Sequence, residues 1–332
     1  MEIPRFWAEH REFRVLAGRR RVTLRRFGWS SSSAEAAAAH ARQRVAEAWT
    51  AWSTGQKPSR REAKLAYGGA DGLPIREEIL SEHPTCGGIV TRNGYGARCL
   101  NVPDVLFADI DLENRREWAA RLCGSLLRGL ILCGLLGWFW WSGGLLRATT
   151  PWSWIGAGFL LLNLFEIIRR WRRWQRARTA EQVLGSLRAW CAVRPDWLLW
   201  VYRTPAGIRT LAAHRLFDPR STETDEFFAA VGVDPVYHRM CRLQDCFRAR
   251  VSAKPWRIGI TARIGWGTWP PVRAVSADRR KTWVATYEQK ASEYAACEFL
   301  EKLGAGPEHP RARAVREWHD QLSQVGRNLP VA

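Results

Sequence analysis

The chain has 332 residues, 46% of them hydrophobic, which is enough for a real core and excludes a disordered protein. Its 51 Lys and Arg residues against 32 Asp and Glu residues give a formal net charge of +19, and arginine far outnumbers lysine. A surface with this charge attracts phosphate on lipid headgroups, nucleotides or nucleic acid, although a codon bias toward arginine would explain the same composition.

The segments before residue 125 predict an N-terminal hairpin and helix followed by a small sheet. Apolar and basic residues mix around Gly18, serines offer N-caps before an Ala-rich run, and the pair Asn93-Gly94 is a strong signal for a tight turn. The predicted elements are a hairpin over 12–16 and 20–27, a helix over 34–52, and strands over 88–92, 97–101 and 105–112.

Two apolar stretches, residues 129–146 and 148–165, contain no charged side chain and are separated only by Arg147. Each is just long enough to cross a bilayer as a helix. Arginines before the first stretch and after the second predict that both termini are cytoplasmic. We therefore expect a transmembrane helical hairpin over residues 125–168 of a multi-pass protein of the bacterial inner membrane, with membrane lipids as partners. The alternative is a buried hairpin in a large soluble core.

The residues after the hairpin predict a second set of helices and strands. A basic helix reaches about residue 193, and Pro205-Ala206-Gly207 marks a turn between two strands. The predicted elements are strands over 197–204, 207–213 and 246–252 and helices over 222–231, 235–240 and 284–303. The predicted fold class is an α+β cytosolic domain, mainly antiparallel sheet with helices, whose parts 1–124 and 169–332 are interrupted by the transmembrane hairpin. Two independent soluble domains are the alternative.

Three carboxylates lie at the end of the predicted strand over 105–112. Because side chains alternate along a strand, Asp109, Asp111 and Glu113 point to the same face. Unpaired, they would raise one another's pKa values, so they need either a divalent cation or an arginine partner. Oxygen ligands of this kind suit Mg²⁺ or Mn²⁺. The strand end therefore predicts a metal site, with arginine salt bridges in solvent as the alternative.

Two further segments carry the groups that bind phosphate. The turn between the strands over 197–204 and 207–213 exposes backbone N–H groups between flanking arginines, and residues 248–257 combine several cations with an indole that could stack on a base. An ordinary hairpin turn and a solvated basic edge strand are the respective alternatives. The candidates for phosphate or nucleotide binding are Arg203, Thr204, Gly207, Arg209, Lys254 and Arg257.

This combination resembles the archaeo-eukaryotic primase and primase-polymerase superfamily. In that family an apolar strand with Asp-x-Asp binds metal, and a later strand pair carries a histidine that contacts nucleotide phosphates. Asp109 and Asp111 match the first motif. Thr204 and Gly207 resemble the second, in which the family's histidine falls at Arg209. Candidates for the family's third acidic residue are Asp218 and Asp234. The Arg- and Trp-rich composition also resembles that of bacterial inner-membrane proteins.

Two functions fit these observations. The first is a non-catalytic, membrane-anchored module that binds an acidic protein partner or anionic lipid through arginine-rich cytosolic surfaces. The second is a metal-dependent protein that binds a nucleotide or nucleic acid. If it is an enzyme, phosphoryl or nucleotidyl transfer is the natural reaction, because a carboxylate-held metal neutralises developing phosphate charge. Replacement of both Asp109 and Asp111 by alanine separates the two.

Overall fold

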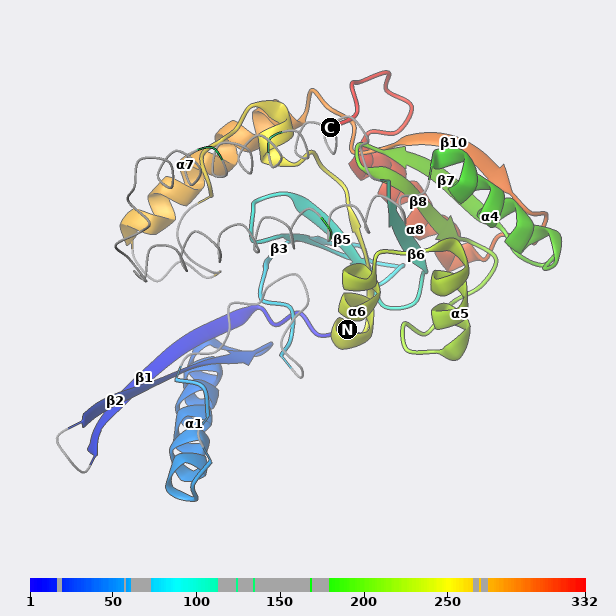
Figure 1. Cartoon of the computed structure of the whole chain (residues 1–332). Helices are drawn as coiled ribbons and strands as arrows, with labels where there is room; N and C mark the ends of the chain where they lie inside the picture. Colours follow the sequence, from blue (N-terminus) through cyan, green and yellow to red (C-terminus); the bar gives the residue numbers. More distant parts are fainter. Residues whose placement is uncertain are drawn as a thin grey trace. The chain divides into compact units, whose positions relative to one another are not determined.

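The computed structural model describes residues 1–16, 20–56, 58–60, 73–112, 179–264, 269 and 274–332, together with the single positions 124, 134 and 168. The chain divides into two compact units, one made of Met1–Ile110 with Gly185–Ala332 and the other of Asp111–Leu184. The first unit holds nearly all of the described residues, and most of its helices and strands are labelled in Figure 1.

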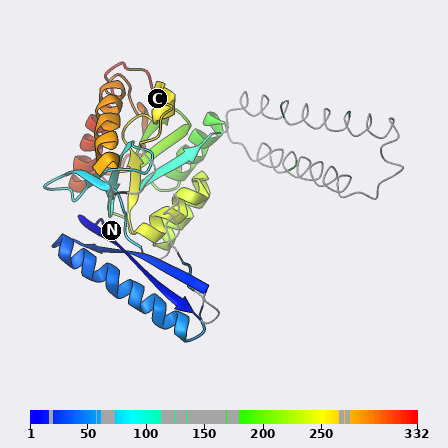
Figure 2. The same ribbon diagram turned by 90° about the vertical axis from the view of Figure 1, so that its left-hand side faces the viewer.

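The N-terminal part of this unit is a two-stranded ribbon with one helix. Strands β1 (Phe6–Leu16) and β2 (Arg20–Ser30) pair antiparallel along their whole length. Figure 2 shows α1 (Ala34–Ser53) along one face of this ribbon. The helix begins at Ser33, whose hydroxyl accepts a hydrogen bond of 3.1 Å from the Ala36 N–H. The predicted hairpin and helix are both present, and the strands are longer than the sequence indicated.

The helix packs closely against the ribbon because the facing positions are small or apolar. Val45 and Trp49 of α1 form a core cluster with Val22 and Leu24 of β2. A Cβ added at Gly28 would lie 2.1 Å from the backbone nitrogen of Ala41, so the helix rests directly on the strand there. The opposite face of the ribbon has no such cover from α1.

A four-stranded sheet holds the predicted carboxylate strand. Its order is β10 (Glu298–Leu303), β7 (Leu199–Thr204), β8 (Gly207–Ala212) and β6 (Phe107–Asp111). The pairs β7–β8 and β10–β7 are antiparallel. The α+β class with antiparallel sheets is therefore observed.

The second four-stranded sheet pairs segments from both halves of the chain. Its order is β3 (Glu78–Glu82), β4 (Ile89–Arg92), β5 (Arg98–Val102) and β9 (Phe247–Arg250), with every neighbouring pair antiparallel. The Tyr237 hydroxyl links the two sheets, because it lies 3.0 Å from the Phe107 carbonyl oxygen of β6 and 2.9 Å from the Arg248 carbonyl oxygen of β9.

Helices begin and end where the sequence supplies caps. Ser221 caps α5 (Thr222–Val231), and Asp234 caps α6 (Pro235–Gln244). The other helices of the described residues are α4 (Ala180–Ala192), the short 3₁₀ helix η2 (Pro255–Ile258), α7 (Ala274–Ala291) and α8 (Pro310–Ser323). Among the described elements, β6 is followed along the chain by α4, β7, β8, α5, α6 and β9, and β9 joins the sheet of β3, β4 and β5.

The prediction of a long helix over 284–303 is wrong for the residues after Ala291. Helix α7 ends at Ala291, and the residues Glu298–Leu303 form the edge strand β10 against β7. The sequence of β10 favours a helix on intrinsic propensity. Pairing with the open edge of β7 overrides that local preference, which no local pattern could show.

Among the described residues, no helix has both the length and the apolar composition that crossing a membrane requires. This finding contradicts the predicted transmembrane hairpin and, with it, the multi-pass inner-membrane location with cytoplasmic termini. The hairpin prediction itself falls on residues 125–168, which lie outside the described residues except at positions 134 and 168. The prediction rested only on the length of the two apolar stretches, and both are close to the shortest length that can cross a bilayer.

Candidate functional site

The sharpest predicted residue, Asp109, is one half of a buried ion pair. Arg209 of β8 donates from Nε to Asp109 Oδ1 at 2.7 Å and from Nη2 to Asp109 Oδ2 at 3.0 Å. The Arg209 side chain is 2% exposed and the Asp109 side chain 27%. Burial by itself would lower the pKa of Arg209, but the Asp109 carboxylate raises it above its usual value. The guanidinium therefore stays charged and holds both carboxylate oxygens.

The remaining donor of Arg209 ties this pair to two other elements. Its Nη1 donates to the Arg250 carbonyl oxygen of β9 at 2.8 Å and lies 3.3 Å from Nε2 of His319 on α8. His319 in turn lies with Nδ1 2.9 Å from Asp320 Oδ1 and packs its ring against Tyr202 of β7. Strands and one helix thus share a single buried polar network around Arg209.

This geometry favours the arginine alternative over a metal at the end of β6. Both oxygens of Asp109 already accept charge-assisted hydrogen bonds. Asp111 is exposed at the strand end, and Glu113 lies outside the described residues. Within the part of the chain that the structure describes, no three His, Cys, Asp or Glu residues are grouped to hold a metal ion. Binding of Mg²⁺ or Mn²⁺ by Asp109, Asp111 and Glu113 stays a prediction.

The two candidates for a third acidic residue have other partners. Asp234 Oδ1 accepts a hydrogen bond of 3.1 Å from the Val236 N–H and so caps α6. Asp218 Oδ1 accepts one of 2.8 Å from the Arg220 N–H.

The predicted phosphate turn between β7 and β8 closes an antiparallel hairpin. The Gly207 N–H donates to Thr204 Oγ1 at 3.0 Å, so this backbone donor is used inside the turn, and phosphate binding by the turn stays a prediction. The exposed Arg203 pairs with Glu298 of β10, and Arg209 points into the buried network. Of the six predicted phosphate residues, Arg203, Thr204, Gly207 and Arg209 are therefore engaged within the fold.

Lys254 and Arg257 flank an exposed indole. Trp256 is 55% exposed, lies with its ring 5.3 Å from the ring of Tyr95, and has the Lys254 ammonium 5.6 Å from its ring centre. We call Tyr95, Arg250, Lys254, Trp256 and Arg257 the aromatic–basic patch. It joins the β4–β5 turn to the end of β9 and to η2.

Buried neighbours hold Trp256 at the surface. Pro255 and Ile258 on either side of it are buried, and Gly259 ends η2 with a positive φ of 77°. Trp256 is therefore displayed by a short, anchored 3₁₀ turn. An exposed large aromatic in such a setting is a typical feature of a binding surface.

The Tyr95 side of the patch is fixed by the turn predicted at Asn93-Gly94. The Asn93 side-chain oxygen accepts hydrogen bonds from the N–H groups of Tyr95, Gly96 and Ala97 at 3.2, 3.1 and 3.1 Å. Gly96 has a φ of 102°, and a Cβ there would lie 2.2 Å from the Trp283 ring. Only glycine fits this position, because the turn and the indole leave no room for a side chain.

Arg250 contributes a donor that the fold leaves unmatched. Its guanidinium hydrogen-bonds with the Tyr95 hydroxyl, whose pKa is raised mainly by burial. Its Nε is buried and has no hydrogen-bond partner among the described residues. Lys254 and Arg257 were predictable from the sequence, because they lie within a few residues of Trp256. The pairing of Tyr95 with Arg250 was not predictable, because only the antiparallel pairing of β5 with β9 brings their segments together.

A second buried ion pair, between Arg248 and Glu77, holds β9 in place. Arg248 Nη2 donates to Glu77 Oε2 at 2.6 Å, and the Thr91 hydroxyl donates to the same oxygen at 2.5 Å. Burial by itself would lower the pKa of Arg248, and the Glu77 carboxylate raises it overall. The strand that carries the patch is thus held by two buried arginine–carboxylate pairs.

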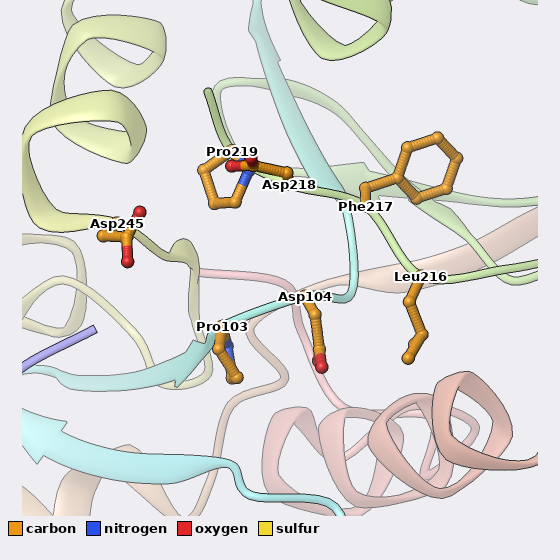
Figure 3. A pocket seen from close by; sticks show the side chains of 7 residues that line it. All are labelled: Pro103, Asp104, Leu216, Phe217, Asp218, Pro219 and Asp245. Atoms are coloured by element: carbon orange, nitrogen blue, oxygen red, sulfur yellow. The ribbon is translucent and has the colours of Figure 1, made fainter. Parts of the chain in front are cut away.

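An open pocket elsewhere in the unit is acidic and does not fit phosphate. Figure 3 shows its lining, in which Asp104, Asp218 and Asp245 are the charged residues. Arg311 lies 3.1 Å from Asp104 Oδ2, and Arg220 lies 3.1 Å from Asp245 Oδ1, so two of the carboxylates are paired within the fold. Burial raises the pKa of Asp104. A carboxylate lining repels an anion, so the aromatic–basic patch is the stronger candidate site.

No protein-family model, curated protein or solved structure matches this chain. The resemblance to primases stays a prediction, and the function is argued from the site itself.

Proposed function

We propose that this chain is a non-catalytic module that binds single-stranded nucleic acid through the aromatic–basic patch. The observation that carries the proposal is the exposed Trp256, held between Tyr95 and Lys254 on an anchored turn. The proposal narrows the acidic partner expected from the charge of the chain to one with bases that stack and phosphates that pair with cations.

Leaving Trp256 in water is costly for the fold. Fully burying a large apolar side chain stabilises a protein by roughly 1.5–3 kcal/mol, and at 55% exposure Trp256 forgoes about half of that. Stacking of a base on an aromatic side chain contributes about 1–3 kcal/mol and tolerates any base, because every base has a π face. A base that stacks on Trp256 would therefore remove the indole from water and gain the burial free energy that folding does not supply at this position.

The cations around the indole suit a phosphodiester backbone. Lys254 and Arg257 supply charge on either side of Trp256, and the Arg250 guanidinium, hydrogen-bonded to the Tyr95 hydroxyl, adds a third positive charge. A guanidinium binds phosphate oxygens in a fixed, planar geometry, which adds orientation to charge attraction. Alternating cations and aromatic rings are the usual surface for single strands.

The Asp109–Arg209 pair supports the non-catalytic part of the proposal. A two-metal transfer site needs carboxylate oxygens free to hold a cation, and Arg209 occupies both oxygens of Asp109. The position at which the resemblance expects a phosphate-contacting histidine is occupied by this same arginine. The resemblance to primases is thus consistent with a shared nucleic-acid-binding fold in which the transfer chemistry is lost.

Fluorescence anisotropy of a labelled oligothymidylate titrated with the full chain tests the proposal. We expect saturable binding that is unchanged by EDTA and that weakens about 5- to 150-fold in Trp256→Ala, the equivalent of one lost stacking contact. Phe299→Ala is the matched control, because Phe299 is an exposed aromatic on β10 outside the patch. Lys254→Ala should lower the slope of log K against log salt by about 0.7.

Two results would contradict the proposal. One is the absence of saturable binding at low salt, or equal losses in Trp256→Ala and Phe299→Ala. The other is primer extension with nucleoside triphosphates and Mn²⁺ that disappears in Asp111→Ala, which would make the chain a metal-dependent enzyme.

A further inference from the structure

The ribbon of β1 and β2 has one face covered by α1 and an opposite face that is largely exposed over residues 11–15 and 21–25. Val22 and Leu24 point to α1 and are buried, so the residues that alternate with them point away from the helix. In the observed register the outward pairs are Arg11 with Arg25, Phe13 with Thr23, and Val15 with Arg21. We call these six residues the ribbon face.

The ribbon face exposes apolar side chains among cations. Phe13 is 54% and Val15 63% exposed, and the Arg21 guanidinium lies 3.9 Å from the centre of the Phe13 ring. Exposed side chains of this size on neighbouring positions of a strand mark an interaction surface. The stacked arginine keeps its charge facing solvent while its plane covers the ring.

The charges of this face are only partly balanced. Arg11 and Arg25 stand directly opposite each other, an arrangement that destabilises an antiparallel pair. Both turn to one carboxylate, Glu9, with Arg25 Nη1 3.5 Å from Glu9 Oε2. Together with Arg21 the face presents three cations against that single anion, so its complement is an anionic partner.

We propose that the ribbon face binds double-stranded DNA in the major groove. The major groove of B-DNA admits a two-stranded ribbon, and the side-chain types match its contents. Arginine pairs with the phosphates that flank the groove or with guanine, a threonine hydroxyl pairs with any base edge, and Phe13 and Val15 suit the thymine methyl group. The major groove of an RNA duplex is too deep and narrow for a ribbon, so DNA is the partner that fits.

Anisotropy or mobility-shift titration of a random duplex with the full chain tests this inference. We expect Arg11→Ala combined with Arg21→Ala to lower the slope of log K against log salt by about 1.8, or 0.9 for each lost phosphate contact. Arg42→Ala is the matched control, because Arg42 is an exposed arginine of α1 outside the ribbon face. All three positions are exposed, and an unchanged thermal melt checks that the variants fold.

The outcome is distinguishable from that of the aromatic–basic patch. Trp256→Ala should bind duplex as the wild type does, and the double arginine variant should bind the single strand as the wild type does. Duplex binding that survives in the double variant, or that falls equally in Arg42→Ala, would overturn the inference. So would a dimer in sedimentation velocity that dissociates in Phe13→Ser without any binding of duplex, because the ribbon face would then belong to a second copy of the chain.

Discussion

Replacement of Asp109 by alanine tests whether its carboxylate serves the fold. The change leaves the Nε and Nη2 donors of Arg209, now at 2.7 and 3.0 Å from Asp109, without partners inside the protein. Breaking a buried ion pair costs about 3–5 kcal/mol of unfolding free energy. Because the Asp109 side chain is 27% exposed, water reaches the site and we expect a loss near the lower end, about 3 kcal/mol.

Urea denaturation followed by circular dichroism measures this loss against two controls. Asp111→Ala, at an exposed position of the same strand end, should change the unfolding free energy by no more than about 1 kcal/mol. Asp109→Leu combined with Arg209→Met removes both charges and should recover part of the stability, because no buried charge is left unpaired and only the Arg250 carbonyl oxygen and His319 lose the Nη1 donor. The single changes Asp109→Leu and Arg209→Met complete a thermodynamic cycle with this double change.

Two results would refute the reasoning about Asp109. The first is a loss below about 1 kcal/mol in Asp109→Ala, which would mean that Arg209 is satisfied without it. The second is a melting temperature of the wild type that rises with Mn²⁺ and does not rise in Asp109→Ala. That pattern would identify Asp109 as a metal ligand.

Three further changes test other parts of the fold. Gly96→Ala should lower the unfolding free energy by about 1–3 kcal/mol, because it places a side chain at a φ of 102° and against the Trp283 ring. An unaltered melting temperature would show that position 96 does not require glycine. Burial is the main cause that lowers the pKa of His214 to about 4, so below pH 6.5 the unfolded chain binds more protons than the folded one. Stability should therefore fall as the pH drops from 6.5 toward 4, and His214→Phe should flatten this dependence in thermal melts; an identical profile would disprove it. Glu77→Gln removes the charge that pairs with Arg248 at 2.6 Å and should cost about 3 kcal/mol in urea denaturation, whereas a loss within error would show that the pair is dispensable.

Local features of the fold were predictable because their causes lie within a few residues. The tight turn at Asn93-Gly94 and the capping serine before α1 depend on side-chain hydrogen bonds to the nearby backbone, and both are observed. The hairpin of β7 and β8 follows from alternation and from the turn between them. Predictions that needed a distant partner fared less well, as β10 shows, since its strand state depends on the edge of β7.

The sequence alone determined the basic character of the chain, its α+β class and the basic segment around Trp256. It also determined that Asp109 and Asp111 share one face of β6, because side chains alternate along a strand. Only the tertiary structure decided that Arg209 of β8 holds Asp109, and that Tyr95 meets Trp256. The physical reason is the range of the interactions. Propensity, alternation and capping act between neighbours along the chain, whereas the pairing of an ion or an aromatic ring depends on which strands lie side by side, and that arrangement is set by burial over the whole unit.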